Sequence, residues 1–176
     1  GVGFLMQREI EMLDRLLYKT QNPFIAILGD SKVSDKIGVI DNLMEKIDTF
    51  IIGGAMAYTF LAAQNIPTGT SKVETDKLKL AAELLQRLEA RGKKILLPQD
   101  HVISQKFEAG APNKVTNDSS IPEGWMGLDI GPKTRALYAN EVIKGKTVFW
   151  NGPMGVFEMP PFEKGTFAIA QALSEM

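Results

Sequence analysis

The sequence has no cysteine and a single histidine, His101, among its 176 residues. The lack of cysteine excludes disulfide bonds, thiolate metal clusters and a cysteine nucleophile, and it is compatible with a reducing cytoplasm. With one histidine, a metal site built from several imidazoles is excluded as well. Neither sign of charge is in excess, since 20 Lys and Arg face 21 Asp and Glu. No overall field draws the chain to nucleic acid or to an anionic membrane, so any anion site must be local.

Long apolar runs are lacking too. No stretch approaches the ~18 consecutive apolar residues that a membrane-spanning helix needs. The first nine residues, GVGFLMQRE, contain no initiating methionine, basic segment or uninterrupted apolar core. They read as the interior of a longer polypeptide rather than as a signal peptide. One soluble domain is expected, because 176 residues with a 44% hydrophobic composition suffice for one substantial core.

Short apolar runs and helical periodicity alternate along the chain. Short, mostly apolar runs that end near glycine or proline predict strands at 24–28, 49–52, 95–97 and 147–150, and the wholly apolar run at 24–28 fits a strand buried on both faces. Apolar residues at helical spacing predict helices over 5–18, 37–47, 56–64, 77–91, 132–143 and 163–176. This alternation predicts an α/β fold, a three-layer αβα sandwich with a mostly parallel, Rossmann-like sheet.

Local signals refine the element boundaries. Ser31 or Ser34 is the expected N-cap of the helix over 37–47, and Gly92 is the expected residue just past the end of the helix over 77–91. Pro132 suits the first turn of the helix that it begins. The segment from about 101 to 127 is rich in polar and turn residues, and no regular element is predicted there.

Four predicted strands end in residues suited to a ligand-binding edge. These residues are Gly29, Gly53–Gly54, Pro98 with Asp100, and Asn151–Gly152–Pro153. Parallel sheets bind ligands beyond the carboxyl ends of their strands, so the convergence of these residues favours a site there. Each glycine can equally serve only to make a tight turn, and that interpretation stays open.

Lys32 and Lys36 are four residues apart at the start of a predicted helix. Because a helix N-terminus disfavours cations, two lysines there indicate a compensating anionic ligand such as a polyphosphate. The alternative is a solvated charged face, with Lys36 paired to a neighbouring carboxylate. Neither G-x-x-x-x-G-K-[ST] nor G-x-G-x-x-G occurs, which argues against a P-loop and against the usual dinucleotide fingerprint.

The stretch from Trp150 to Glu158, WNGPMGVFE, joins an apolar strand to a rigid turn. The turn brings backbone close to whatever lies above the sheet and presents Glu158, which could accept hydrogen bonds from ribose hydroxyls. An exposed glutamate in an ordinary loop is the alternative. Trp150 and Phe157 are expected in the core rather than as stacking platforms.

Six motifs occur in the order found in one enzyme family: GVGFLMQREI, FIAILGDSKVSDKIGVIDNLMEKID, TFIIGGAMAYTFL, ILLPQD, GWMGLDIGPKT and TVFWNGPMGVFE. On these motifs the chain resembles the carboxyl-terminal, nucleotide-binding domain of phosphoglycerate kinase along essentially its whole length. The resemblance implies a reversible phosphoryl transfer between ATP and 3-phosphoglycerate in glycolysis, with ADP or ATP as nucleotide and Mg²⁺ held mainly by the nucleotide.

The resemblance also implies roles for individual residues. Lys32 is implied to be catalytic, because the matching lysine neutralises the phosphoryl group in flight. The residues implied to bind nucleotide are Gly29 and Lys36 at the phosphates, Gly53, Gly54, Gly127 and Leu128 at adenine, Asn151, Pro153, Gly155 and Val156 along the cleft, and Glu158 at the ribose. No metal ligand is expected within the chain.

Two departures from the family pattern limit what the resemblance implies. The family usually reads Gly-Gly-Ala/Ser-Lys where this chain has Gly29-Asp30-Ser31-Lys32, and Asp30 could repel phosphates or pair with Lys32. The chain also stops before the family's Gly-Gly-Gly-Asp loop and lacks the amino-terminal domain that binds 3-phosphoglycerate.

We therefore expect residues 1–176 to form one C-terminally incomplete domain of a cytoplasmic, monomeric two-domain kinase, inactive in isolation. A stand-alone nucleotide-binding module and a purely structural α/β domain are the alternatives. No nucleic-acid or membrane partner is expected.

Overall fold

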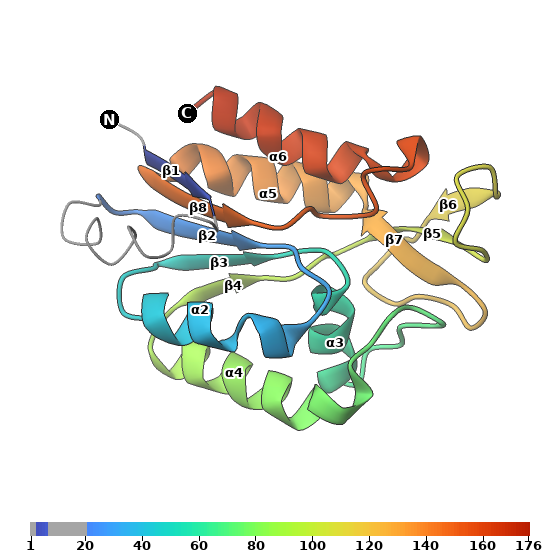
Figure 1. Cartoon of the computed structure of the whole chain (residues 1–176), viewed down its shortest axis with the longest axis horizontal. Coiled ribbons are helices and arrows are strands. Elements are labelled where there is room, and N and C mark those ends of the chain that lie inside the picture. Colours follow the sequence, from blue (N-terminus) through green and yellow to red (C-terminus); the bar gives the residue numbers. More distant parts are fainter. Residues whose placement is uncertain (1–2, 7–20) are drawn as a thin grey trace.

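The computed structural model describes residues 3–6 and 21–176. A central sheet of five strands has the spatial order β1-β8-β2-β3-β4 (Figure 1). Its strands are β1 (Gly3–Met6), β2 (Phe24–Leu28), β3 (Thr49–Ile52), β4 (Lys94–Leu96) and β8 (Thr147–Asn151). Every neighbouring pair in this sheet is parallel. The predicted parallel sheet is confirmed.

Helices cover both faces of this sheet. One face carries α2 (Ile37–Leu43), α3 (Met56–Ala63) and α4 (Leu78–Ala90), and the other carries α5 (Pro132–Lys144) and α6 (Lys164–Ser174) (Figure 1). Short 3-10 turns are η2 (Val33–Asp35), η3 (Thr75–Lys77) and η4 (Pro160–Phe162). The αβα sandwich is thus confirmed. No helix in the described part of the chain is long and apolar enough to cross a membrane.

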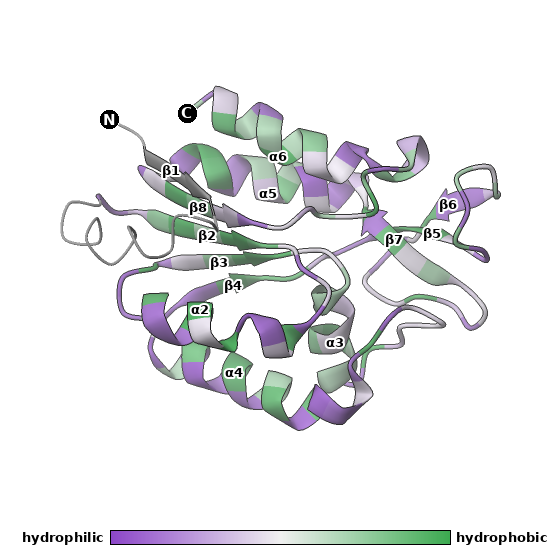
Figure 2. Ribbon diagram, viewed as in Figure 1, coloured by the Kyte–Doolittle hydropathy of each residue, from purple (hydrophilic) through white to green (hydrophobic). Residues whose placement is uncertain are grey.

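The side chains of the apolar strands contribute to two separate core layers. In β2, Phe24, Ala26 and Leu28 pack toward α2, α3 and α4, whereas Ile25 and Ile27 pack toward α5 and α6. Successive strand residues point to opposite faces, so a strand covered on both sides must be apolar throughout. Figure 2 shows this continuous apolar character along the middle of the sheet.

A second sheet occupies the segment for which no element was predicted. It is a three-stranded antiparallel sheet in the order β6-β5-β7, formed by β5 (His101–Ser104), β6 (Asn113–Val115) and β7 (Met126–Ile130). Figure 1 shows it beyond the carboxyl ends of the parallel strands, beside α3 and the start of α6. The expectation of an irregular segment is wrong here, because these short strands carry polar side chains and lack an apolar run.

Some boundary predictions also need correction. Most of the helix predicted over 5–18 falls on residues outside the described part, while Leu5 and Met6 belong to β1. Neither Ser31 nor Ser34 caps α2, which follows Lys36 without a side-chain cap. The hydroxyl of Ser34 instead donates to Glu74 Oε2 over 2.6 Å.

The order of the parallel strands contains one reversal. From β2 the chain proceeds to β3 and β4, whereas β8 returns to the opposite side of β2. Loops that follow two such strands turn away from one another and leave a crevice between them. The fold therefore predicts a ligand-binding crevice at the carboxyl ends of β2 and β8.

Candidate functional site

A cavity of about 360 Å³ lies beyond the carboxyl ends of β2 and β8. Its lining residues are Gly29, Asp30, Ser31, Gly54, Ala55, Tyr58, Lys72, Phe107, Met126, Gly127, Leu128, Pro153, Gly155 and Val156. They come from the loops after β2, β3 and β8, from α3, from the segment before η3 and from the antiparallel sheet. The cavity thus joins the two sheets.

The base of the cavity depends on close backbone approach. A Cβ on Gly29 would collide with the carbonyl oxygens of Gly152 and Pro153. The neighbouring Gly54 has a φ of +64°, and a Cβ there would meet the carbonyl of Gly29. Glycine is therefore required at both strand ends, because the loops after β2, β3 and β8 pack backbone against backbone there.

One end of the cavity is apolar. Tyr58 of α3 is buried, and its ring stands against the backbone of Gly127 in β7. Leu128 and Val156 complete this wall, and the amide of Gly127 donates to Ser71 Oγ over 2.8 Å. Burial raises the pKa of Tyr58, and the charge of Asp129 acts in the same direction. Tyr58 is thus a neutral, fixed surface suited to a flat apolar group.

The other end of the cavity is charged. Lys36 is buried, with its side chain 1% exposed, and its ammonium lies 3.1 Å from Asp30 Oδ2. The backbone N–H of Ser31 donates to Asp30 Oδ1 over 2.7 Å. Partial burial works against ionisation of Asp30, but the Ser31 hydrogen bond and the cations Lys36 and Lys72 hold its pKa below the usual value. Asp30 and Lys72 therefore line this end, and Lys36 pairs with Asp30 from outside the lining.

A buried acid supports the floor from behind. Asp129 in β7 is fully buried and accepts 2.9 Å hydrogen bonds from the backbone N–H groups of Ile130 and Gly165. Burial raises its pKa to about 7, although both hydrogen bonds and the charge of Arg135 oppose the rise. Leu128 precedes Asp129 in β7, and a Cβ on Gly155 would meet Asp129. Asp129 therefore links the cavity floor to the first turn of α6 through its hydrogen bond with Gly165.

Asn151 ends β8 beside Gly29, whose backbone N–H donates to its carbonyl over 2.8 Å. Its side chain is 2% exposed, and within residues 3–6 and 21–176 neither its amide nitrogen nor its amide oxygen has a hydrogen-bond partner. Buried polar groups almost always have partners. The unsatisfied amide therefore lies buried at the switch between β2 and β8, outside the residues that line the cavity.

The structure brings most of the sequence-predicted site residues together. Gly29, Gly54, Gly127, Leu128, Pro153, Gly155 and Val156 line the cavity. Lys32, Lys36, Gly53, Asn151 and Glu158 do not line it. Gly53 packs against Met154, and Lys32 and Glu158 are exposed. Lys36 is held through Asp30 rather than beside Lys32, so the two lysines do not share one solvated face.

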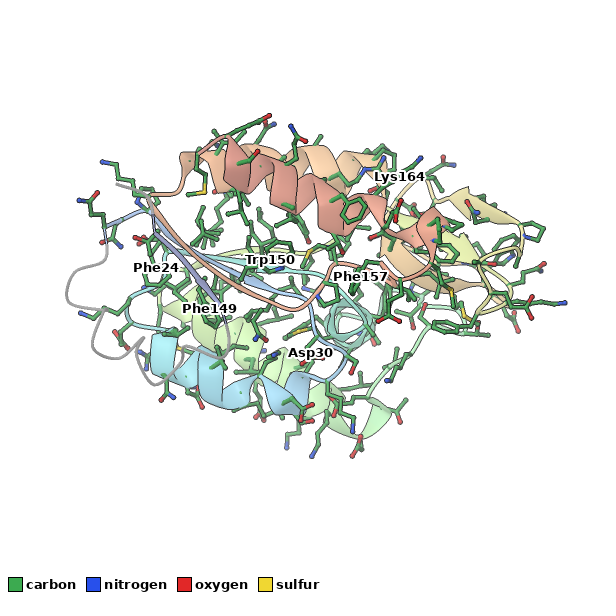
Figure 3. The ribbon with its side chains drawn as sticks, turned by 45° about the horizontal axis from the view of Figure 1, so that its top comes forward. Phe24, Asp30, Phe149, Trp150, Phe157 and Lys164 are labelled. Carbon is green, nitrogen blue, oxygen red and sulfur yellow. The ribbon has the colours of Figure 1, made fainter. Side chains whose placement is uncertain are left out.

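Two other expectations change in the structure. Phe157 is 41% exposed and does not belong to the core, whereas Trp150 is partly buried against the α5 and α6 layer. Figure 3 shows Asp30 and Phe157 well away from Phe24, which enters β2 at its amino end. Asp100, proposed for the ligand edge, instead accepts hydrogen bonds from the backbone of Lys133 and Thr134 at the start of α5.

Sequence reasoning did not single out Tyr58, Lys72, Phe107 and Met126 as lining residues. Tyr58 falls in an ordinary apolar helix, and Lys72, Phe107 and Met126 lie in or beside segments whose structure was not predicted. Tyr58 is distinguished only by its burial against Gly127, a glycine of the antiparallel sheet. That signal exists in space and not in the local sequence.

An open parallel sheet, helices on both faces and a cavity at the reversal of strand order define this protein as a doubly wound α/β domain of the ligand-binding kind. The family profile of phosphoglycerate kinase matches residues 1–176. This chain belongs to the phosphoglycerate kinase family.

Relatives and solved structures agree with that family. The phosphoglycerate kinase of Clostridium novyi is 55% identical over 173 residues, covering 98% of this chain and 44% of the relative. That of Bdellovibrio bacteriovorus is 54% identical over 175 residues, covering 99% and 44%. The chain therefore spans less than half the length of these relatives.

Among solved structures, phosphoglycerate kinase from Coxiella burnetii matches with a TM-score of 0.90 and 37% identity over 96% of this chain and 43% of that one. The enzyme from Pyrococcus horikoshii OT3 matches with a TM-score of 0.80 and 28% identity over the same shares. The fold described above is thus that of the family.

Metal ligands do not cluster in the described residues. No group of three or more histidine, aspartate or glutamate side chains there could hold a metal ion. Asp30 is the one carboxylate among the described residues that line the cavity, and it is paired with Lys36. The residues present do not form a Mg²⁺ site by themselves.

Proposed function

We propose that this chain supplies the nucleotide site of a phosphoglycerate kinase, which transfers a phosphoryl group reversibly between ATP and 3-phosphoglycerate in glycolysis. One observation carries the proposal: a single cavity at the β2–β8 switch has an apolar end and a lysine-bearing end. Its volume, about 360 Å³, is within the range of small-ligand sites. An adenine ring suits the first end and phosphates suit the second.

The cavity suggests how a nucleotide would lie. Adenine would rest against Tyr58, Gly127 and Leu128, in the wall where a flat apolar group finds most contact. The phosphates would run past Gly29 toward Lys36, where the missing Cβ permits close approach of the backbone. Asn151, Pro153, Gly155 and Val156 would border the path between these ends, with Glu158 at the ribose and Gly53 behind the adenine wall.

Phosphoryl transfer requires positioning and charge stabilisation more than covalent chemistry from the protein. Lys32 is exposed and precedes the turn that ends at Lys36. In our proposal Lys32 neutralises the phosphoryl group as it moves, while Lys36 holds the phosphates that stay. Mg²⁺ would enter with the nucleotide, since phosphate oxygens supply its ligands and the described residues contain no group of three or more candidate ligands.

The remainder of the reaction is assigned to other parts of the protein. The chain covers about 44% of its relatives' length, so we propose that residues 1–176 form one domain of a two-domain enzyme. The 3-phosphoglycerate site would lie in the other domain. We further propose a monomeric, cytoplasmic enzyme with no nucleic-acid or membrane partner. The isolated 176-residue chain should show no turnover in a coupled kinase assay, and measurable turnover would contradict this proposal.

Calorimetric titration of the chain with ADP tests the nucleotide site directly. We expect saturable binding that Lys36→Ala weakens by roughly 10- to 100-fold, the range for hydrogen bonds to a charged group. Lys79→Ala is the matched control, because Lys79 is an exposed lysine of α4 that does not line the cavity. It should leave affinity unchanged. Equal loss in both variants, or no saturable ADP binding at all, would favour a purely structural domain.

A further inference from the structure

Lys36 is a buried cation with an internal partner. Its side chain is 1% exposed, while that of Asp30, 3.1 Å away, is 42% exposed. A buried ammonium requires a counter-charge, since desolvation strongly disfavours an unpaired ion. Asp30 supplies that charge in the structure, and it does so from the lining of the cavity.

The two partners differ in their freedom to move. Lys36 precedes the first residue of α2 and is enclosed by protein. The backbone of Asp30 is fixed, because its carbonyl accepts from the N–H of Met56 over 2.9 Å, but its carboxylate borders both solvent and cavity. An anion entering from the cavity could therefore replace the carboxylate without uncovering the ammonium.

We propose that Asp30 is an exchangeable counter-ion of Lys36, which an incoming phosphate displaces, and that Asp30 thereby sets the anion affinity of the cavity. The inference rests on the proposed function, because it concerns the same site. With Asp30 in place, the charges of Lys36, Lys72 and Asp30 sum to +1. Without the carboxylate they sum to +2, and an anion would have no internal competitor.

A cation site at Asp30 is the competing interpretation. A carboxylate next to phosphates can bind a divalent cation instead of repelling the phosphates. The geometry favours the counter-ion, because Asp30 Oδ1 is occupied by the Ser31 N–H and Oδ2 by Lys36. Asp30 is also the one carboxylate among the described residues that line the cavity, and the described residues contain no group of three or more candidate metal ligands.

The test compares Asp30→Asn with wild type, using ADP, inorganic pyrophosphate and adenosine, with EDTA and with Mg²⁺. Asparagine keeps the shape and removes the charge. We expect ADP and pyrophosphate to bind about three- to tenfold more tightly to the variant in EDTA, in line with removal of one partly exposed ion pair. Adenosine should bind unchanged. Asp35→Asn is the matched control, because Asp35 is exposed in the same segment and lies outside the cavity.

A double-mutant cycle with Lys36→Met assigns the effect to the pair. In the Lys36→Met background, Asp30→Asn should no longer tighten binding of ADP or pyrophosphate. Asp30→Ser removes the same charge with a smaller side chain and is measured alongside, so the test does not depend on one variant folding.

The possible outcomes separate the two proposals. Weaker binding of Mg²⁺-ADP by Asp30→Asn, with no gain in EDTA, would make Asp30 a metal ligand and overturn the counter-ion. An equal gain in anion affinity from Asp30→Asn in the wild-type and Lys36→Met backgrounds would also overturn the counter-ion proposal. Failure of wild type to bind either ADP or adenosine would overturn the nucleotide site, while pyrophosphate would still decide whether Asp30 competes with an anion.

Discussion

The two sheets of this molecule are stabilised by different means. The parallel sheet buries apolar side chains on both faces, in one core layer toward α2, α3 and α4 and another toward α5 and α6. The antiparallel sheet contributes Ile130 to the second of these layers, and its other buried apolar residues belong to small clusters, such as those of Ile103 and Val102. Its buried residues include Asp129 and His101, and Asp100 directly precedes it. Burial holds the first region together, and specific hydrogen bonds contribute more to the second.

The difference matters because the cavity lies between the two sheets. Gly29, Gly54 and Pro153 come from the parallel sheet, and Met126, Gly127 and Leu128 from β7. Polar contacts join β7 and its neighbours to the helix layer, through Asp129 at α6 and Asp100 at α5. Geometry at the proposed adenine wall therefore depends on a few directional contacts, whereas geometry at the glycine base depends on close packing.

The largest expected loss of stability comes from a substitution in the apolar core of the parallel sheet. Phe149 in β8 is fully buried in the core layer that faces α2, α3 and α4. Phe149→Ala should lower the free energy of unfolding by about 3–5 kcal/mol, since it removes a large side chain and leaves a cavity. Val115→Ala in β6 removes apolar surface from a residue that is 47% exposed and should cost less than about 0.5 kcal/mol.

Urea denaturation followed by circular dichroism measures both variants. Equal losses of unfolding free energy in the two variants would show that β6 packs more tightly than its exposure indicates. That result would contradict the contrast between the two sheets.

A smaller effect is expected at the polar connection to α5. Asp100 is 1% exposed and accepts from the backbone N–H groups of Lys133 and Thr134, each over 3.0 Å, and from Thr134 Oγ1 over 2.6 Å. Asp100→Asn replaces one acceptor with a donor and should cost about 1–3 kcal/mol, the range for a buried group left unsatisfied. Hydrogen exchange should rise in the first turn of α5 more than in β2.

Asp118→Asn is the control for that experiment, because Asp118 is exposed and its Oδ1 accepts from the backbone N–H of Ser120. A comparable loss of stability from Asp118→Asn would mean that burial does not determine the value of these hydrogen bonds.

The same contrast explains which elements sequence reasoning could find. The runs at 24–28, 49–52 and 147–150 are apolar apart from an initial threonine in the last two, because both faces are buried, so their pattern records their environment. In contrast, β5 contains His101 and Ser104, and β6 is wholly exposed. Tertiary hydrogen bonds such as that from Ser104 Oγ to the carbonyl of Pro112 stabilise these residues. No local periodicity encodes them.

The candidate site divides in the same way. Glycines at strand ends were predictable, because close backbone approach requires that residue type. Pairing of Lys36 with a neighbouring carboxylate was one of the alternatives, but its partner was not predictable, since spacing alone allowed Asp30 to meet Lys32 instead. Burial of one partner distinguishes these pairs, and burial depends on tertiary packing around Lys36, which spacing does not reveal. Family motifs identify the lysines but do not indicate their counter-ions.

The smallest expected effect is a pH dependence that arises in the antiparallel sheet. His101 is fully buried, and its Nε2 lies 2.9 Å from the carbonyl oxygen of Ser119. Because a carbonyl only accepts, Nε2 carries the proton and donates, and Nδ1 has no partner within the described residues. Burial lowers the pKa of the imidazole below 6.5, although the Ser119 carbonyl and the charges of Asp100 and Asp118 oppose this.

The unfolded state then binds more protons than the folded state below pH 6.5, so stability must fall as the pH drops from there toward the folded pKa. The slope for one site is at most about 1.4 kcal/mol per pH unit. His101→Gln keeps a donor for Ser119 and removes the titration, so the difference in unfolding free energy between wild type and variant should shift in favour of the variant below pH 6.5. The chain has one histidine, so an NMR titration of its imidazole reports this pKa without overlap. A measured pKa above 6.5 would reverse the sign of this pH dependence. It would show that the nearby carboxylates outweigh burial in setting the pKa of His101.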